Sequence, residues 1–196
     1  MVESQIAARG VRDPRVLAAM RKVPRHLFVP PGQESRAYDD EPLPIGAGQT
    51  ISQPYIVAFM TEVLDLRAED RVLEVGTGSG YQTAVLAEIV RKVFSVEVIE
   101  ELSRRASRTL ERLGYRNIVF RTGDGARGWI EEAPFDAILV AAAPAAVPPA
   151  LRDQLAVGGR MIIPVGSGAQ ELVLVRRTER GTEEACVLSV RFVPLI

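Results

Sequence analysis

The stretch VLEVGTGSGYQTAVLAEI, Val72 to Ile89, joins an apolar run to a helical pattern through a turn that holds Gly76, Gly78 and Gly80. A strand, a glycine-rich turn and a helix in this order are typical of the first βα unit of a ligand-binding parallel sheet. Free backbone N–H groups at such a helix start favour an anion, either a pyrophosphate or the carboxylate of an amino acid. This stretch therefore predicts both a fold class and a binding site.

The rest of the chain repeats the alternation of strand and helix. We expect helices over about 80–90, 100–113 and 149–155, and buried apolar strands at 71–75, 92–98, 117–122, 135–140 and 158–165. Alternation at this pitch predicts parallel βαβ units. Two more strands, at 171–177 and 185–196, are expected to form a hairpin-like edge. The predicted fold is α/β, with a doubly wound, Rossmann-like sheet of about seven mostly parallel strands.

The first 50 residues have a different pattern. A short helix is expected over 2–9 and is stopped by Gly10, and Asp13 is expected to cap a second helix that has Pro14 at its first position. Residues 30–50 are rich in proline, glycine and aspartate and are predicted to be loop. Ser52 is expected to cap a helix that runs from Pro54 to about Leu64. Residues 1–50 thus form a predicted N-terminal helical extension.

Composition excludes several classes of function. The 196 residues carry a formal net charge of −1, so the basic surface of a nucleic-acid binder is not expected. One cysteine, Cys186, and one histidine, His26, leave no disulfide framework and no His/Cys metal site. The apolar run 137–151 is broken by prolines, which argues against a membrane span. The first ten residues show no secretory signal, so we expect a reducing cytoplasm.

The turn departs from the dinucleotide-binding pattern G-x-G-x-x-G, because Tyr81 stands at the position of the third glycine. It has the form E-x-G-x-G-x-G from Glu74 to Gly80. Glu97 ends the second strand, about 20 residues after the glycine turn. In dinucleotide-binding sheets an acid at this place binds the ribose hydroxyls. Asp124 follows the third strand, where it is expected to reach an adenine amino group. The combination fits S-adenosyl-L-methionine. The predicted cofactor-binding residues in this region are Glu74, Gly76, Thr77, Gly78, Ser79, Gly80, Glu97, Asp124 and Gly125.

Two structural alternatives stay open for these residues. The glycines can form a tight βα turn without any ligand, and Glu97 can be a solvated acid at a strand end. The arginines at positions 104, 105, 108 and 112 follow Glu100 and Glu101 at helical spacing, which is most simply a solvated helix face. For His26 a structural or surface role is favoured over catalysis.

The sequence resembles the protein-L-isoaspartate O-methyltransferases along nearly its whole length. The resemblance rests on RHLFVP at 25–30, GQTISQP at 48–54, the glycine turn, GDG at 123–125, GGRMIIPVG at 158–166 and VRFVPL at 190–195. Among these, GQTIS is the most specific, because methyltransferases in general lack it. The resemblance implies a methyltransferase fold in which residues 51–196 form the S-adenosylmethionine-binding catalytic domain and residues 1–50 a cap on the substrate side.

The resemblance also implies a reaction. A methyl group passes from S-adenosyl-L-methionine, which leaves as S-adenosyl-L-homocysteine, to the free α-carboxyl of an L-isoaspartyl residue in a damaged protein or peptide. D-Aspartyl residues are possible further substrates. The ester then closes to a succinimide that can open to normal aspartate. No nucleic acid, membrane or metal takes part in the reaction implied.

Ser52 matches the family's active-site serine, and its implied role is to orient the carboxylate by a hydrogen bond. The nucleophile is already ionised at pH 7, so no general base is required. The alternative role for Ser52 is helix capping alone. Thr50 and Ile51 are expected to flank the cofactor. Val193, Pro194 and Leu195 are expected to bind substrate, because VRFVPL can form an edge strand that pairs with a peptide main chain. The alternative role for VRFVPL is an ordinary closing strand. Ala47, directly before GQTIS, departs from the family pattern.

Three other functions are compatible with parts of the pattern. A methyltransferase of the same fold can act on a small molecule or RNA, but the sequence VAAAP stands where an amine-methylation motif is expected. A nicotinamide-dependent oxidoreductase is disfavoured by Tyr81. A cofactor-binding module without activity is disfavoured by the presence of Ser52, Glu97 and Asp124.

Overall fold

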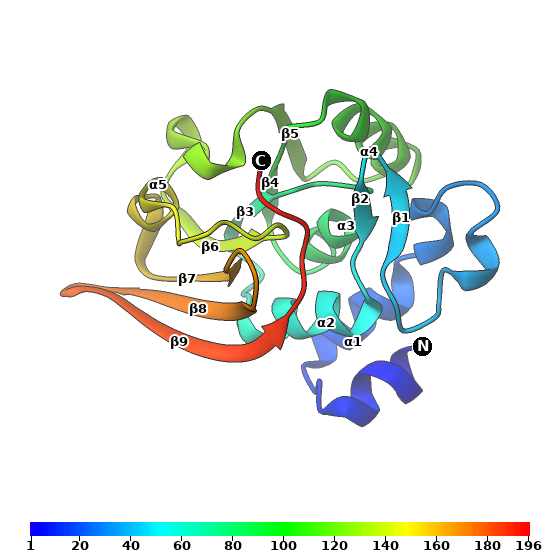
Figure 1. The fold of residues 1–196 in the computed structure, drawn as a ribbon, viewed down its shortest axis with the longest axis horizontal. Helices are drawn as coiled ribbons and strands as arrows, with labels where there is room; N and C mark the ends of the chain where they lie inside the picture. The colour runs from blue at the N-terminus through cyan, green and yellow to red at the C-terminus, as the bar shows by residue number, and fades with distance from the viewer.

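The computed structural model describes residues 1–196 and has one large mixed sheet with helices on both faces (Figure 1). The sheet has seven strands in the order β5-β4-β3-β6-β7-β8-β9. Strands β3 to β7 run parallel, and β8 and β9 continue the sheet antiparallel as a hairpin. The strand bounds are Arg71–Val75 (β3), Lys92–Glu97 (β4), Ile118–Thr122 (β5), Phe135–Val140 (β6), Leu155–Val165 (β7), Gln170–Thr178 (β8) and Gly181–Val190 (β9). The predicted fold class is confirmed.

The apolar runs form the centre of the sheet because they are buried on both faces. Strand β3 pairs with β4 on one side and β6 on the other. Leu73 and Val75 pack toward α5 (Pro149–Asp153), and Val72 packs on the opposite face with α2 (Pro54–Val63) and α3 (Tyr81–Ala87). A strand covered on both faces has no solvated side, which explains why its sequence does not alternate.

The N-terminal segment packs on the helices rather than on the sheet. It comprises the short helical turns Val2–Ile6 and Ala7–Arg9 and helix α1 (Pro14–Lys22). Asp13 caps α1 as predicted, because its carboxylate accepts the backbone N–H of Arg15 at 2.8 Å. Buried residues of this segment share one apolar cluster with α3 and α4 (Glu100–Arg112). None of the helices combines the length and the apolar character that a membrane-spanning helix requires.

The sequence predicted that residues 30–50 are loop, and this prediction is wrong for part of the segment. They contain strand β1 (Leu43–Gly46), which pairs with β2 (Gln49–Ile51) as an antiparallel hairpin. Leu43, Ile45 and Ile51 are buried and fix its inner face. The turn runs through Gly46, Ala47 and Gly48, all with positive φ. The prolines and glycines that indicated loop instead form the tight turn and the edges of a short hairpin.

Two further expectations from the sequence are wrong. Helix α2 begins after Gln53, so Ser52 lies one residue before the N-cap and does not cap the helix. The last six residues do not extend the edge strand. After Val190 the chain leaves the sheet, and its strand-type pairing is limited to an isolated parallel bridge between Pro194 and Ala143 (Figure 1). This C-terminal segment, residues 191–196, crosses the carboxyl end of β6.

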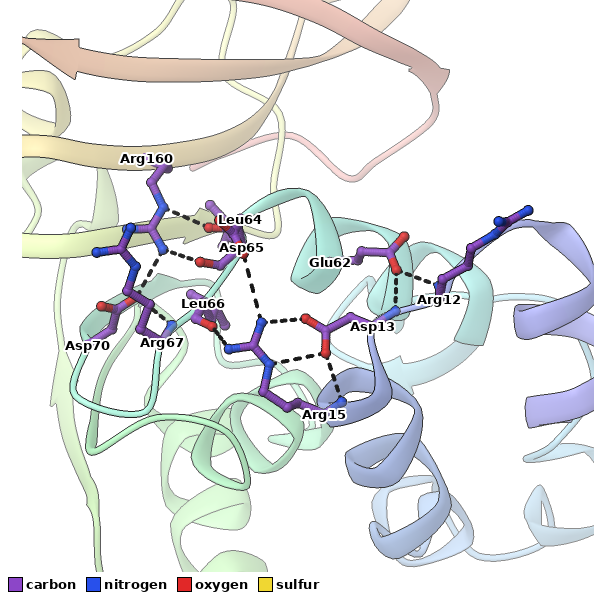
Figure 2. Close-up of polar contacts among 10 residues, drawn as sticks. All are labelled: Arg12, Asp13, Arg15, Glu62, Leu64, Asp65, Leu66, Arg67, Asp70 and Arg160. Atoms are coloured by element: carbon purple, nitrogen blue, oxygen red, sulfur yellow. Dashed lines mark hydrogen bonds and ion pairs between the residues drawn. The ribbon is translucent and has the colours of Figure 1, made fainter.

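A polar cluster ties the N-terminal segment and β7 to the loop between α2 and β3 (Figure 2). From β7, Arg160 donates to the carbonyl of Leu64 at 2.8 Å and to the Asp70 carboxylate at 3.0 Å. From α1, Arg15 donates to the carbonyl of Leu66. The carboxylate of Glu62 accepts the backbone N–H groups of residues 12 and 13. Three segments distant in sequence are thus fixed at the amino end of β3. The carboxyl end of β3 takes no part in this cluster.

Candidate active site

A cavity opens at the carboxyl ends of the central strands, where ligands bind in doubly wound sheets. It encloses about 750 Å³ of space when its open mouth is included. Its walls come from the hairpin end, the turn after β3, the residues after β4 and β6, and the C-terminal segment. We call it the first cavity. Its lining residues are Gln49, Thr50, Ile51, Ser52, Val57, Val75, Gly76, Thr77, Gly78, Ser79, Tyr81, Gln82, Val96, Glu97, Val98, Ile99, Gly125, Ala141, Ala142, Val193, Pro194, Leu195 and Ile196.

The glycine turn lies against the start of the β6–α5 connection. Gly76 has a φ of 94°, and a Cβ there would stand 3.5 Å from the Ala141 Cβ. Gly78 has a φ of 53°. L side chains rarely adopt these backbone angles, so glycine lets the main chain turn and form the cavity wall directly. The structure therefore places Gly76 and Gly78 at the cavity, as the sequence predicted.

Glu97 lies at the end of β4 and faces the same cavity with only 5% of its surface exposed. One carboxylate oxygen accepts the backbone N–H of Gly78 at 2.8 Å, and the other accepts that of Ile99 at 3.0 Å. Each oxygen can accept a second hydrogen bond, so two hydroxyl donors can still be bound. The carboxylate is thus fixed by the turn itself, and the solvated alternative for Glu97 does not hold.

Glu74 lies beneath the turn and does not line the cavity. It is fully buried, and one of its oxygens accepts hydrogen bonds from Thr83 on α3 and Ser95 on β4, both at 2.6 Å. The Ser95 hydroxyl also lies 2.6 Å from that of Thr77, which does line the cavity. Burial raises the pKa of Glu74 to about 8, against the opposing effect of the two hydroxyls. Its place is under the glycine turn rather than in contact with the cavity.

Two other residues predicted to bind the cofactor lie outside the cavity lining. Gly80 has a φ of 88° and starts α3, and a Cβ there would stand 3.1 Å from the Ala106 Cβ on α4, so it allows two helices to approach closely. Asp124 accepts the backbone N–H of Ala126 at 2.9 Å and lies 3.3 Å from Arg127, with 48% of its side chain exposed. Its neighbour Gly125 does line the cavity.

A second cavity adjoins the first on the side of the C-terminal segment. Its lining residues are Pro42, Thr50, Ser52, Gln53, Ile56, Ala141, Ser189, Val190, Arg191, Phe192 and Val193. Thr50, Ser52, Ala141 and Val193 line both cavities. Ser52 therefore lies in the wall between the two cavities. Val193, which the sequence predicts to bind substrate, lies in the same wall. Pro194 and Leu195 line only the first cavity.

Four residues that follow β4 and β6 line the first cavity although the sequence does not mark them as site residues. Val98 and Ile99 come directly after Glu97, and Ala141 and Ala142 come directly after β6. The rule that ligands bind beyond the carboxyl ends of parallel strands would have found all four. Their apolar character gave no chemical signal of its own.

The motif around the single histidine is structural. Nδ1 of His26 lies 2.6 Å from the Tyr38 hydroxyl, and His26 lines neither cavity. The neighbouring Arg25 is fully buried, donates to the carbonyl of Ala37 at 2.6 Å and stands 4.8 Å from the ring centroid of Tyr81. Burial lowers the pKa of Arg25 to about 10. Through Tyr81, this motif supports the wall of the first cavity.

The residues that line the first cavity suit S-adenosyl-L-methionine in their chemistry. Glu97 is buried, held by two amides and still able to accept hydroxyl protons, as the ribose of a nucleoside requires. A Cβ at Gly125 would stand 2.4 Å from a Val75 methyl, so glycine lets the turn after β5 pack directly on β3 at the cavity wall. Apolar residues after β4 and β6 complete the lining.

Comparison with known proteins decides the family. The family model described as protein-L-isoaspartate(D-aspartate) O-methyltransferase (PCMT) matches residues 1–196. The chain belongs to this family. A PCMT relative from Synechococcus sp. (strain JA-2-3B'a(2-13)) is 56% identical over 204 residues, which cover 100% of this chain and 84% of the relative. Another from Methanoculleus marisnigri is 56% identical over 197 residues, covering 100% of this chain and 90% of the relative.

Solved PCMT structures share the whole fold. One protein-L-isoaspartate O-methyltransferase superposes with a TM-score of 0.90 at 32% identity, over 99% of this chain and 65% of the other. A PCMT from Plasmodium falciparum, in complex with S-adenosyl-L-homocysteine, superposes with a TM-score of 0.86 at 27% identity, over 100% of this chain and 96% of the other. The chain is therefore an S-adenosylmethionine-dependent enzyme with the protein-repair activity of the PCMT family.

Proposed function

We propose that the two cavities divide the reaction between them. The first holds S-adenosyl-L-methionine, and the second admits an L-isoaspartyl residue of a damaged protein or peptide, whose free α-carboxyl is methylated at the shared wall. The observation that carries this proposal is that Thr50, Ser52, Ala141 and Val193 line both cavities. A donor and an acceptor approaching from opposite sides would meet at that wall.

The roles proposed for the residues follow from the chemistry. When bound, S-adenosyl-L-methionine supplies a methyl group made electrophilic by its sulfonium. The accepting carboxylate has a pKa of roughly 3.5 and needs no base, so the chain has to align it and exclude water. Ser52 donates a hydrogen bond to one carboxylate oxygen and directs the other. A neutral hydroxyl orients this nucleophile without neutralising it.

The cofactor is held by the turn and by the ends of β4 and β5. Glu97 accepts the ribose hydroxyls while it stays bonded to Gly78 and Ile99. Thr50, Ile51, Gly76, Thr77, Ser79 and Gly125 form the remaining proposed contacts. For Asp124, a contact with an adenine amino group falls to the oxygen that lies 3.3 Å from Arg127, because the other oxygen is bonded to Ala126. Glu74 and Gly80 act indirectly, through the shape of the turn.

The N-terminal residues 1–50 are proposed to act as a cap on the substrate side of a catalytic domain that spans 51–196. Pro42 lines the second cavity, and Gln49 and Thr50 line the first. A reducing cytoplasm is the proposed compartment, supported by a single free cysteine.

Paired peptides test the substrate. They carry L-isoaspartate, D-aspartate or L-aspartate at one position and are incubated with S-adenosyl-L-methionine labelled in its methyl group. We expect base-labile label on the L-isoaspartyl peptide and none on the L-aspartyl peptide, and label on the D-aspartyl peptide would extend the substrate range. Equal labelling of the L-isoaspartyl and L-aspartyl peptides, or label on neither, contradicts the proposal. Label on a small molecule or RNA alone would favour the same-fold alternative.

The role of Ser52 is tested by Ser52→Ala. Loss of a hydrogen bond to a charged group predicts a turnover number about ten- to a hundredfold lower. Binding of S-adenosyl-L-homocysteine, measured by calorimetry, should persist. Ser107→Ala on the outer side of α4, where the hydroxyl bonds only to Glu111, is the matched control. Unchanged turnover in Ser52→Ala would remove Ser52 from the mechanism.

A further inference from the structure

The second cavity carries a single charge. Of its 11 lining residues only Arg191 is ionisable, and the others are apolar, hydroxyl or amide side chains. Arg191 is exposed, whereas Ser52 in the wall toward the first cavity is half-buried. The cavity therefore leads from a cationic outer part to a neutral inner wall.

No carboxylate of the protein neutralises this arginine. Arg191 takes part in none of the ion pairs of the structure. Pro42 lines the second cavity, and the two acids that precede it in the sequence are paired elsewhere. Asp40 pairs with Arg9 at 2.7 Å, and Glu41 pairs with Arg36. The guanidinium is thus left with its donors available to a ligand.

The backbone beside Arg191 is held firmly. Gln170 on β8 accepts the N–H of Phe192 at 2.6 Å through its side-chain oxygen and donates to the Phe192 carbonyl at 3.1 Å. Val190, on the other side of Arg191, pairs with the same glutamine in the β8–β9 register. The Cα of Arg191 is fixed at the cavity, while its long side chain is exposed and takes part in no ion pair, which suits a contact with variable partners.

We propose that Arg191 is a specificity-determining residue that binds the carboxylate side chain of a substrate residue flanking the isoaspartate. This inference rests on the proposed function. Arg191 pairs with the flanking acid rather than with the carboxylate to be methylated, because a guanidinium on the nucleophile would lower its reactivity. Glutamate and aspartate side chains are ionised at neutral pH and match the guanidinium fork. The enzyme then prefers isoaspartyl sites in acidic surroundings.

Matched peptides test this charge preference. Each carries L-isoaspartate and one variable residue, Glu, Gln or Lys, moved through the flanking positions. At one position or more, we expect the KM of the wild-type enzyme to be about two- to fivefold lower for Glu than for Gln, as for a partly exposed ion pair, and higher for Lys. The Glu/Gln ratio should shrink toward one at about 0.5 M NaCl.

Variants assign the preference to Arg191. In Arg191→Gln the Glu/Gln ratio of KM values should fall to about one, and in Arg191→Glu the order of the Glu and Lys peptides should reverse. Arg180→Gln, in the exposed turn between β8 and β9, removes the same charge elsewhere and should keep the wild-type ratio.

The outcomes separate this inference from the proposed function. A wild-type enzyme that shows no charge preference at any position, or an Arg191→Gln variant that keeps the preference, overturns the role of Arg191 while isoaspartyl methylation stands. Failure of the wild-type enzyme to methylate even the Gln peptides at isoaspartate would overturn both.

Discussion

Two glutamates lie buried at neighbouring strand ends, and their surroundings give them different roles. Glu97 accepts two backbone amides and faces the first cavity, so its negative charge is stabilised where a ligand can use it. Glu74 accepts two hydroxyls and lies wholly beneath the turn. The acid of the E-x-G-x-G-x-G pattern thus supports the turn from below, and the acid one strand further faces the ligand.

Glu74 predicts a pH dependence of stability. The pKa of Glu74 is raised by burial to about 8 in the folded protein, from 4.5 without the protein environment. Between these values the folded state keeps a proton that the unfolded state has released. The free energy of unfolding should therefore fall as pH rises, by up to about 1.4 kcal/mol per pH unit from this group.

The Glu74→Gln variant has no proton to release at this position. Its free energy of unfolding should therefore lack the contribution of Glu74 to the decrease with rising pH. Urea unfolding at about pH 5, 6.5 and 8 would measure the difference between variant and wild type, with Glu101→Gln on the exposed face of α4 as the control for a lost carboxylate. A constant difference between Glu74→Gln and wild type across this range would show that Glu74 does not titrate in it.

At the level of single residues, the sequence predicts which residues lie at the cavity, but it does not predict the contacts that each of them makes. The positions of Gly76, Gly78 and Glu97 at the cavity follow from the strand-turn-helix pattern. The side-chain direction of Asp124 does not, because a local bond to the Ala126 amide competes with any ligand contact. The role of Gly80 depends on how closely α4 approaches, which only the folded structure gives.

At the scale of elements, the short 3-10 turn Gly125–Arg127 after β5 forms part of the first cavity only because it packs tightly on β3. A Cβ at Gly125 would stand 2.4 Å from a Val75 methyl. Val75 is buried, and its branched side chain has few other rotamers, so the turn itself would have to move.

Gly125→Ala should therefore weaken binding of S-adenosyl-L-homocysteine about tenfold and lower the free energy of unfolding by about 1–3 kcal/mol, the usual cost of overpacking. Calorimetry and urea unfolding measure the two effects. Gly168→Ala, whose Cβ would meet nothing within 4 Å, is the control. Adding Val75→Ala opens the space again, so the double variant should be less impaired than the sum of the single changes. Additive effects would contradict the steric explanation.

The elements predicted correctly are those with long apolar runs. Strands β3 and β6 have the predicted bounds, and β4, β5 and β7 differ by a few residues at their ends. The hairpin β1–β2 was missed because its glycines and prolines indicate turns, while its three buried apolar residues are too few to show a pattern. The valines and phenylalanine of the C-terminal segment indicate a strand, yet its backbone bonds go to Ala143 and to the side chain of Gln170 rather than to a neighbouring strand. Tertiary contacts decide such segments.

At the scale of the whole molecule, Arg160 joins the second half of the sheet to the α2–β3 loop (Figure 2). The side chains of Arg160 and Asp70 are 12% and 8% exposed, and the Arg160 guanidinium also donates to three backbone carbonyls. This cluster holds the amino end of β3 while the carboxyl end carries the site.

Arg160→Met should lower the free energy of unfolding by about 3–5 kcal/mol, because it leaves Asp70 buried without its partner. Arg160→Lys should recover only part, since an ammonium cannot reproduce the fork of bonds. Arg180→Met, in an exposed turn, serves as the control, and urea unfolding is the measurement. A loss below about 1 kcal/mol would mean that the cluster is dispensable for stability.

Strand β9 forms an outer edge of the sheet, and residues 181–186 are all exposed there. An unpaired strand edge attracts other extended chains, and proteins that carry such edges place charges on them. Glu183 and Glu184 lie on this edge. These two carboxylates make the free edge of β9 a poor template for an extended segment of another chain, including the peptides that this family methylates.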